Sequence, residues 1–312
     1  MNPDLPALER RLGRQRLAER LRKQRGKTAR LLHQGEGLLR IERIVPLDAI
    51  VLIFLRMFGL AGAARRGFLD VRLSEQVWHL DRLDPAFDGF RLLQLTDLHL
   101  DLDPALTPVI AAHLVKTPHD AAVITGDFRN STAGPFDQCV RETAKILAVL
   151  GADRWGVLGN HDFIEMAPAL ERIGLPILLN EADCIRRGGA RLWFAGIDDP
   201  HFYKTHDVEA ARRAIPPGEC SIFLAHSPEV YAEAGDHFDL QLSGHTHAGQ
   251  LCLPGGRPVV VPCKVPGKFV HGRWRHGNLQ GYTSPGTGSC GVPARLNCTP
   301  EITLHILHSG RR

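Results

Sequence analysis

The sequence alternates short apolar runs with longer segments of mixed polarity. The runs are RLLQL (91–95), AAVIT (121–125), WGVLG (155–159), RLWFAGI (191–197), CSIFLA (220–225) and DLQLS (239–243). Runs of this kind predict buried β-strands, and the segments 104–116 and 136–150 between them predict helices. Strands that alternate with helices indicate an α/β fold in which helices cover the sheets. A Gly- and Pro-rich tail, 251–309, ends in a further strand-like run at 301–307.

The composition is that of a globular protein with one unusual feature. The chain has 312 residues, of which 44% are hydrophobic and 23% charged, and this excludes collagen-like, fully disordered and multi-spanning membrane proteins. Its seven cysteines form no C-x-x-C pair, so we expect a reducing compartment and buried or reduced thiols rather than a zinc motif. The 16 histidines point to metal or acid–base chemistry.

Polar residues with metal-binding side chains follow five of the predicted strands. Ligands in α/β proteins bind beyond the carboxyl ends of strands, so we expect these side chains to meet there. Oxygen and imidazole donors without cysteine suit manganese, iron or zinc. Seven donors are too many for one ion and suit two ions that share a carboxylate. The candidates are Asp97, His99, Asp127, Asn160, His226, His245 and His247.

The same residues form an ordered series of motifs. The series D-x-H, G-D, G-N-H-D, H and G-H-x-H begins at Asp97 and ends at His247, and it resembles the calcineurin-like metallophosphoesterase superfamily. The resemblance covers residues 91–250. Gly286-Thr287-Gly288, the segment 292–296 and Pro300-Glu301 are similar to a bacterial branch with membrane-associated phosphodiesterases. Some members of that branch hydrolyse the pyrophosphate of UDP-2,3-diacylglucosamine in lipid A synthesis.

The resemblance implies a fold, a metal centre and a reaction. The fold would be two packed mixed β-sheets flanked by helices, formed by a catalytic domain over residues 72–309. Two divalent metal ions would be bound, with manganese the first expectation and iron or zinc the alternatives. A metal-bridging hydroxide would attack phosphorus. One ion would be held by Asp97, His99, Asp127 and His247, and the other by Asp127, Asn160, His226 and His245.

The resemblance also assigns roles beside the metal. His161 would bind no metal and would either protonate the leaving oxygen or stabilise charge on the phosphoryl group. Many relatives carry an acidic residue that orients this histidine, three positions after the bridging aspartate. Here Asn130 takes that position, so either His161 acts mainly as a hydrogen-bond donor or another carboxylate orients it. Arg129 is a candidate contact for a phosphate oxygen.

The N-terminal residues 1–71 differ in character from the rest of the chain. Residues 1–44 hold 12 Lys/Arg against 5 Asp/Glu, and their leucine spacing predicts a short amphipathic basic helix. The apolar stretch 49–64 is interrupted by Arg56 and is shorter than the roughly 20 residues that cross a bilayer. We expect residues 1–64 to contact an anionic membrane surface from the cytoplasmic side of the plasma membrane. A solvated extension, a nucleic-acid arm and a buried core helix are the alternatives.

Together these observations predict a metal-dependent hydrolase of a phosphodiester or pyrophosphate bond. The N-terminal residues favour a lipid-linked substrate such as UDP-2,3-diacylglucosamine. A nucleotide phosphodiesterase or nuclease is the alternative substrate class, and a non-catalytic metal-binding scaffold is the alternative to an enzyme. Residues 45–312 hold 26 Lys/Arg against 29 Asp/Glu, and this net charge of −3 disfavours duplex nucleic acid as a partner.

Overall fold

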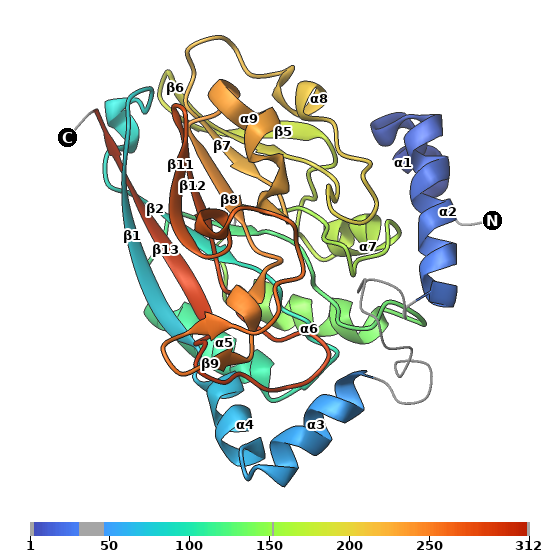
Figure 1. Ribbon diagram of the computed structural model, residues 1–312. Helices are drawn as coiled ribbons and strands as arrows, with labels where there is room; N and C mark the ends of the chain where they lie inside the picture. Colours follow the sequence, from blue (N-terminus) through green and yellow to red (C-terminus); the bar gives the residue numbers. More distant parts are fainter. Residues whose placement is uncertain (1–2, 31–46, 152, 311–312) are drawn as a thin grey trace.

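The computed structural model describes residues 3–30, 47–151 and 153–310. Two β-sheets pack against each other, and helices cover both outer faces (Figure 1). This arrangement confirms the expected fold class. The α-helices are α1 (Leu5–Leu12), α2 (Arg14–Arg30), α3 (Leu47–Met57), α4 (Ala61–Leu69), α5 (Leu106–Lys116), α6 (Asp137–Leu147), α7 (Met166–Arg172), α8 (Val208–Arg212) and α9 (Tyr231–Ala234).

The first sheet has the strand order β1-β13-β2-β3-β4. Its strands are β1 (Arg72–Leu80), β13 (Glu301–Ser309), β2 (Phe90–Leu95), β3 (Ala121–Ile124) and β4 (Arg154–Gly156). The last three run parallel, so their carboxyl ends lie at one edge of the sheet. The strand predicted at the end of the chain joins this sheet as β13, between β1 and β2.

The second sheet has the order β11-β12-β8-β7-β6-β5. Its strands are β5 (Glu181–Arg187), β6 (Ala190–Gly196), β7 (Ser221–Leu224), β8 (Leu240–Ser243), β11 (Gly272–His276) and β12 (Leu279–Thr283). The four central strands are parallel, and the antiparallel strands β5 and β11 close the two edges. A small hairpin of β9 (Cys252–Leu253) and β10 (Arg257–Pro258) lies apart from both sheets.

The apolar side chains separate into layers that match this architecture. One cluster fills the space between the sheets and includes Leu92, Phe194 and Leu242. A second cluster joins the outer face of the first sheet to α5, α6 and α7, and a third joins the second sheet to α8 and α9. Strands buried on both faces read as continuous apolar runs, and this is why their positions were predictable.

The basic N-terminal segment is folded onto the body of the protein. Helices α1 and α2 pack beside α7 and β5, with the leucines of their apolar stripe buried in the same cluster as α5–α7 (Figure 1). Arg11 donates to Glu171 and Glu181, and Arg16 pairs with Asp207. The single amphipathic helix that was predicted is present as two helices, α1 and α2, whereas the alternative of a solvated extension is wrong for residues 5–26. Residues 31–46 lie outside the described part of the chain.

Arg20 is the innermost contact of α2. Its guanidinium is fully buried, lies 3.0 Å from the equally buried carboxylate of Asp198, and stacks 3.3 Å from the ring centre of Tyr203. It also donates to the backbone carbonyl of Asp162. A buried charge is tolerated only with such partners, because its transfer from water is costly. This pair therefore ties α2 to the second sheet and to the turn after β4.

The apolar stretch 49–64 forms part of two short helices instead of one. Gly59, with a φ of 67°, separates α3 from α4, and Leu55 and Ala64 pack on Val292 and Ala294 of the C-terminal tail. The opposite face of α3 leaves large apolar side chains exposed. Within the described residues no helix combines the length and apolar character needed to cross a bilayer.

We predict that Arg20→Ala lowers the free energy of unfolding by about 3–5 kcal/mol, because it leaves Asp198 buried without its cation. Denaturant titration of both proteins measures the change. The exposed Arg25 on the same helix is the matched control, and its alanine variant should stay within about 0.5 kcal/mol of the parent. Equal losses for the two variants would contradict this account of α2.

Candidate metal centre

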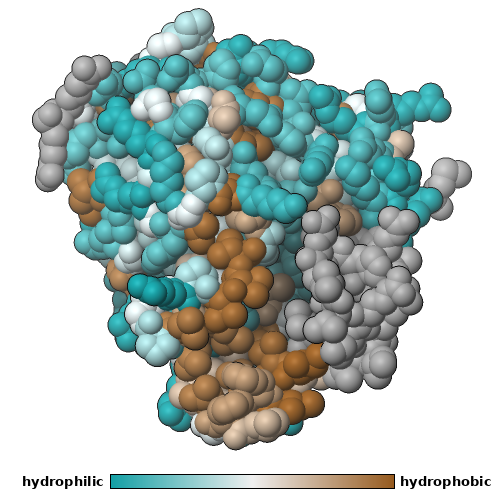
Figure 2. All heavy atoms as spheres, viewed as in Figure 1, coloured by the Kyte–Doolittle hydropathy of each residue, from teal (hydrophilic) through white to brown (hydrophobic). Residues whose placement is uncertain are grey.

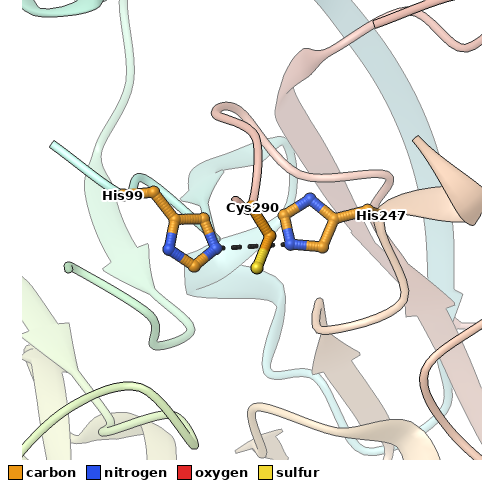
Figure 3. Close-up of side chains that lie close together, drawn as sticks. All are labelled: His99, His247 and Cys290. Carbon is orange, nitrogen blue, oxygen red and sulfur yellow. Dashed lines mark hydrogen bonds between the residues drawn. The ribbon is translucent and has the colours of Figure 1, made fainter. Parts of the chain in front are cut away.

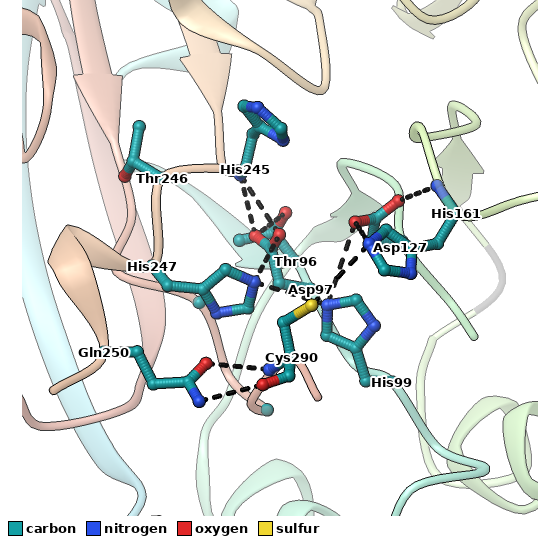
Figure 4. A network of polar contacts seen from close by, with 12 residues as sticks. Thr96, Asp97, His99, Asp127, His161, His245, Thr246, His247, Gln250 and Cys290 are labelled. Carbon is teal, nitrogen blue, oxygen red and sulfur yellow. Dashed lines mark hydrogen bonds and ion pairs between the residues drawn. The ribbon is translucent and has the colours of Figure 1, made fainter. Parts of the chain in front are cut away.

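The polar residues predicted to form a site do come together. The turns after β2, β3 and β4 of one sheet meet the turn after β8 of the other (Figure 4), and the turn after β7 adds His226 to the same group. Because both groups of strands are parallel, their carboxyl ends face the same side of the sandwich. The seven predicted metal ligands lie on these five turns.

Backbone strain is concentrated at these turns. Five of the seven predicted ligands have positive φ angles between 45° and 70°, namely Asp97, His99, Asp127, His245 and His247. A non-glycine residue in this conformation costs of order 1–3 kcal/mol and persists only where the surroundings hold it. Strain of this kind is typical of functional sites, where an unfavourable backbone conformation is kept because it places a side chain correctly.

Asp127 lies at the centre of the group. One of its oxygens, Oδ2, is 3.3 Å from Nε2 of His226 and 3.7 Å from Nε2 of His99. Asp127 shares one compact set of potential ligand atoms with His226 and His245, and a second set with His99 and His161. Asp127 is therefore the residue that these two sets have in common.

The remaining predicted ligands extend the group on either side. His247 Nε2 lies 3.3 Å from His99 Nε2 and 3.4 Å from an oxygen of Asp97. On the other side, the Asn160 side-chain oxygen lies 3.0 Å from His226 Nε2. The contacts in this paragraph join five of the seven predicted ligands. The other two, Asp127 and His245, lie with His226 in one compact set of potential ligand atoms, so the structure connects all seven.

The donor atoms fit a divalent metal. His99 and His226 donate from Nδ1 to the backbone carbonyls of Arg129 and Thr125, at 2.8 and 2.9 Å, and this directs Nε2 into the site. Metal-binding histidines are typically oriented in this way. His245 has a buried Nε2 with no hydrogen-bond partner among the described residues. Two nitrogens bound to one ion at about 2.1 Å would lie about 3.4 Å apart in a tetrahedral arrangement, close to the spacing between His99 and His247.

Charge in the site also favours a cation. Burial raises the pKa of the Asp127 carboxyl, but the imidazoles of His226 and His161 outweigh burial and hold that pKa well below its usual value. Burial lowers the pKa of His226, yet the Asp127 carboxylate raises it to about 10, so without a metal this ring carries a proton that a bound cation would displace. Burial and neighbouring imidazoles lower the pKa of His245 and His247, so both rings stay neutral with a lone pair to donate.

Asp162 holds two of the site's turns together. Its buried carboxylate accepts backbone N–H groups from Asp127, Phe128 and Gly159 at 2.8–2.9 Å, and a longer one from Arg129. These donors belong to two different turns, so a single carboxylate fixes the turn after β3 against the turn after β4. Burial, with the nearby Asp127 charge, raises the pKa of Asp162 to about 6.

His161 is oriented by a backbone group. Its Nδ1 donates to the carbonyl oxygen of Asn130 at 2.6 Å, and its Nε2 faces the site, 4.0 Å from Asp127. The side chain of Asn130 has a different partner: its oxygen accepts a hydrogen bond from the backbone N–H of Gly291. The ring of His161 is thus oriented by the neutral backbone carbonyl of Asn130, which does not stabilise the charged form of the ring as a carboxylate would.

The side chain of Arg129 is engaged away from the metal ligands. Its guanidinium donates to the carbonyls of Ala133 and Gly134 and lies 4.4 Å from the ring centre of Phe163. Its contribution to the site is its own carbonyl, which accepts from His99. A phosphate contact by Arg129 therefore stays a prediction without support from these contacts.

Sequence analysis missed two residues at the site. Asp162 was visible in the G-N-H-D motif, but its role depends on hydrogen bonds that the motif does not display. Cys290 was grouped with the other tail thiols, although its Sγ lies 3.6 Å from His161 Nε2. A single cysteine 43 residues beyond the last histidine motif carries no spacing signal.

A separate polar cavity of about 770 Å³ lies at the opposite ends of strands β8 and β12. It is lined by residues that include Arg82, Asp239, Arg273 and Gln280, and none of the seven predicted ligands lines it. The metal centre is thus distinct from this cavity.

We predict that Asp162→Ala lowers the free energy of unfolding of the metal-free protein by at least about 3 kcal/mol. The substitution leaves several buried backbone N–H groups without a hydrogen-bond acceptor. Denaturant titration tests this. Asp137→Ala is the control, because Asp137 is exposed. A loss no larger than that of the control would show that other groups hold the two turns together.

Comparison with known proteins agrees with the site. Residues 90–249 match the model of the calcineurin-like phosphoesterase family. The metallophosphoesterase YkoQ of Bacillus subtilis is 30% identical over 258 residues, which span 78% of this chain and 92% of YkoQ. Phosphodiesterase YaeI of Escherichia coli is 28% identical, over 69% of this chain and 81% of YaeI. A zebrafish transmembrane protein with a metallophosphoesterase domain is 29% identical, over 85% of this chain and 63% of that protein.

Among solved structures, the Haemophilus influenzae NAD nucleotidase aligns with a TM-score of 0.44 at 15% identity. The alignment covers 64% of this chain and 46% of the nucleotidase. The family match spans every turn that carries a predicted ligand, and the relatives align over most of the chain. The protein is therefore a metal-dependent hydrolase that belongs to the calcineurin-like metallophosphoesterase family.

Proposed function

We propose that the protein hydrolyses a phosphodiester or pyrophosphate bond in a lipid-linked substrate, with two divalent metal ions at the carboxyl ends of the strands. The observation that carries this proposal is the position of Asp127, whose carboxylate is shared by two sets of ligand atoms. One ion is assigned to Asp97, His99, Asp127 and His247, and the other to Asp127, Asn160, His226 and His245. Manganese is the first expectation, with iron or zinc as alternatives.

The protein supplies position and charge for the reaction. Two bound cations would lower the pKa of a water between them and neutralise the phosphoryl oxygens. Asp127 keeps its negative charge across the neutral pH range, which favours cations on both sides of it. His161 presents Nε2 towards the site with Nδ1 fixed by a carbonyl. We therefore assign His161 as a donor to a phosphoryl or leaving-group oxygen.

An apolar surface beside the metal centre supports a lipid-linked substrate. Figure 2 shows apolar side chains gathered over α3 and α4, and the exposed ones include Ile53, Phe54, Met57 and Phe58. The tail segment that packs against these helices also holds Gly291, which lies against Asp48 at the start of α3. Exposed apolar patches of this kind mark binding sites or membrane contacts.

We propose that this surface rests on a membrane from which the substrate is taken. The N-terminal arm has a smaller part than its charge implied, because Arg11, Arg16 and Arg20 are engaged in ion pairs within the protein. Within the described residues, the segment 5–26 thus stabilises the fold, and we assign the membrane contact to the segment 47–58. The cytoplasmic face of the plasma membrane is the proposed location.

We predict that the protein releases UMP from UDP-2,3-diacylglucosamine with added Mn²⁺, and that Asp127→Ala abolishes turnover because it removes the shared ligand. His161→Ala should keep the metal content and lower kcat by about 10²–10⁴. The exposed His237 provides the matched control for the histidine change. Product release and metal analysis of the four proteins measure these effects.

Other outcomes identify the alternatives. Hydrolysis of nucleotide diesters but not of the lipid substrate would contradict the lipid assignment and favour a nucleotide phosphodiesterase. Bound metal without turnover of the lipid substrate, an aryl diester or an aryl monoester would favour a non-catalytic scaffold.

We predict that Phe54→Glu with Phe58→Glu weakens binding to anionic phospholipid vesicles by at least about tenfold, since burying each ring contributes about 1.5–3 kcal/mol. Vesicle co-sedimentation measures the change. Val115→Glu is the matched control, because Val115 is an equally exposed apolar residue on α5, away from the apolar surface. Unchanged binding of the double variant would exclude α3 as the membrane contact.

A further inference from the structure

Cys290 is the one thiol of the described chain that lies among the metal-binding side chains. Its Sγ and the Nε2 atoms of His99 and His247 all lie within 4.8 Å of one another (Figure 3). The sulfur faces the space between the two rings, on the side from which His161 also approaches. The two imidazoles come from the turns after β2 and β8, whereas the cysteine comes from the C-terminal tail.

The tail holds Cys290 in this position with several hydrogen bonds. The side chain of Gln250 accepts the backbone N–H of Cys290 at 2.8 Å and donates to its carbonyl at 2.9 Å (Figure 4). The next residue, Gly291, donates its N–H to Asn130. Backbone contacts on both sides of the side chain therefore aim the sulfur at the site.

The spacing suits a shared ion. A zinc–sulfur bond of about 2.3 Å and a zinc–nitrogen bond of about 2.1 Å span at most about 4.4 Å, and the sulfur and the two nitrogens lie within 4.8 Å of one another. His247 is a neutral donor, since burial and the neighbouring His99 and Arg295 lower its pKa. His99 directs its Nε2 inward through its bond to the Arg129 carbonyl. The buried Nε2 of His245, without a partner in the described part of the chain, belongs to the ligand set of the other ion and indicates that the adjoining position is built for a cation.

We propose that the Cys290 sulfur is an additional ligand of the ion held by His99 and His247. The proposal rests on the metal centre of the proposed function and adds a residue that the seven-ligand set does not contain. On binding, the thiol releases its proton to solvent and the thiolate donates to the metal. The other ion, held by Asn160, His226 and His245, has no thiol neighbour among the described residues.

A sulfur ligand changes which metal the position prefers. Thiolates select softer ions such as zinc over manganese, whereas carboxylate and imidazole alone discriminate less. The two positions of the centre therefore differ in their preference, and the thiol-bearing one should favour zinc when both zinc and manganese are present. Cys290→Ser keeps the size of the side chain and removes the soft donor.

Cobalt(II) tests this directly, because a thiolate ligand adds a near-ultraviolet charge-transfer band to the visible bands of bound cobalt. The full-length protein loaded with cobalt should show that band, and Cys290→Ser should lose it while keeping the visible bands. In competition with Mn²⁺, Cys290→Ser should bind Zn²⁺ at least about tenfold more weakly than the parent protein does. Roughly tenfold is the smallest loss of metal affinity that is typical when a group that supports the metal ligands is removed. Cys184→Ser, a half-buried cysteine on β5, is the control.

The failures are distinguishable. Identical near-ultraviolet spectra for both proteins, with visible cobalt bands present, would overturn the role of Cys290 and leave the metal centre intact. If the parent protein shows no cobalt bands at all, the proposed function is overturned together with this inference. A second measurement uses the parent protein alone, so a folding defect of the variant cannot affect it. Zn²⁺ should slow the alkylation of Cys290 by iodoacetamide and leave the alkylation of Cys184 unchanged. Equal alkylation of Cys290 with and without zinc would also overturn the proposal.

Discussion

The carboxylate of Asp162 is the contact on which the geometry of the site depends. It accepts backbone N–H groups from two turns that belong to different strands, and one of these is the N–H of Asp127 itself. Five of the predicted metal ligands have strained backbone, and such strain persists only where the surroundings hold it. Arg20 reaches the same turn from the N-terminal helix through the carbonyl of Asp162. The centre is thus supported from both the catalytic body and the N-terminal segment.

Most of the fold and most of the site could be predicted from the sequence, for one physical reason. Buried parallel strands are apolar throughout, so each strand and its carboxyl end are visible as a run followed by a polar residue. Because parallel strands end at one edge, the polar residues after RLLQL and AAVIT had to lie together, and those after DLQLS join them from the second sheet. The expected fold class and family were confirmed, and the seven predicted ligands do assemble. Their division between two ions stays a prediction.

Contacts between distant segments were the part that the sequence did not show. The pairing of Arg20 with Asp198 joins residues that lie far apart in the chain, and an arginine in a basic helix looks like any other. The partner of His161 is a backbone carbonyl, which leaves no mark in the choice of side chain at position 130. Cys290 reaches the site through the fold of the tail. Strands such as β5 and β11 were missed because edge strands are polar on one face.

The central claim is that Asp127 lies between two metal ions, and a crystal grown with Mn²⁺ tests it most directly. Anomalous scattering from manganese should give two peaks about 3.5–4 Å apart, one on each side of the Asp127 carboxylate. The first should contact His99 and His247, and the second His226 and His245. A single peak, or a pair of peaks that does not share Asp127, would contradict the account.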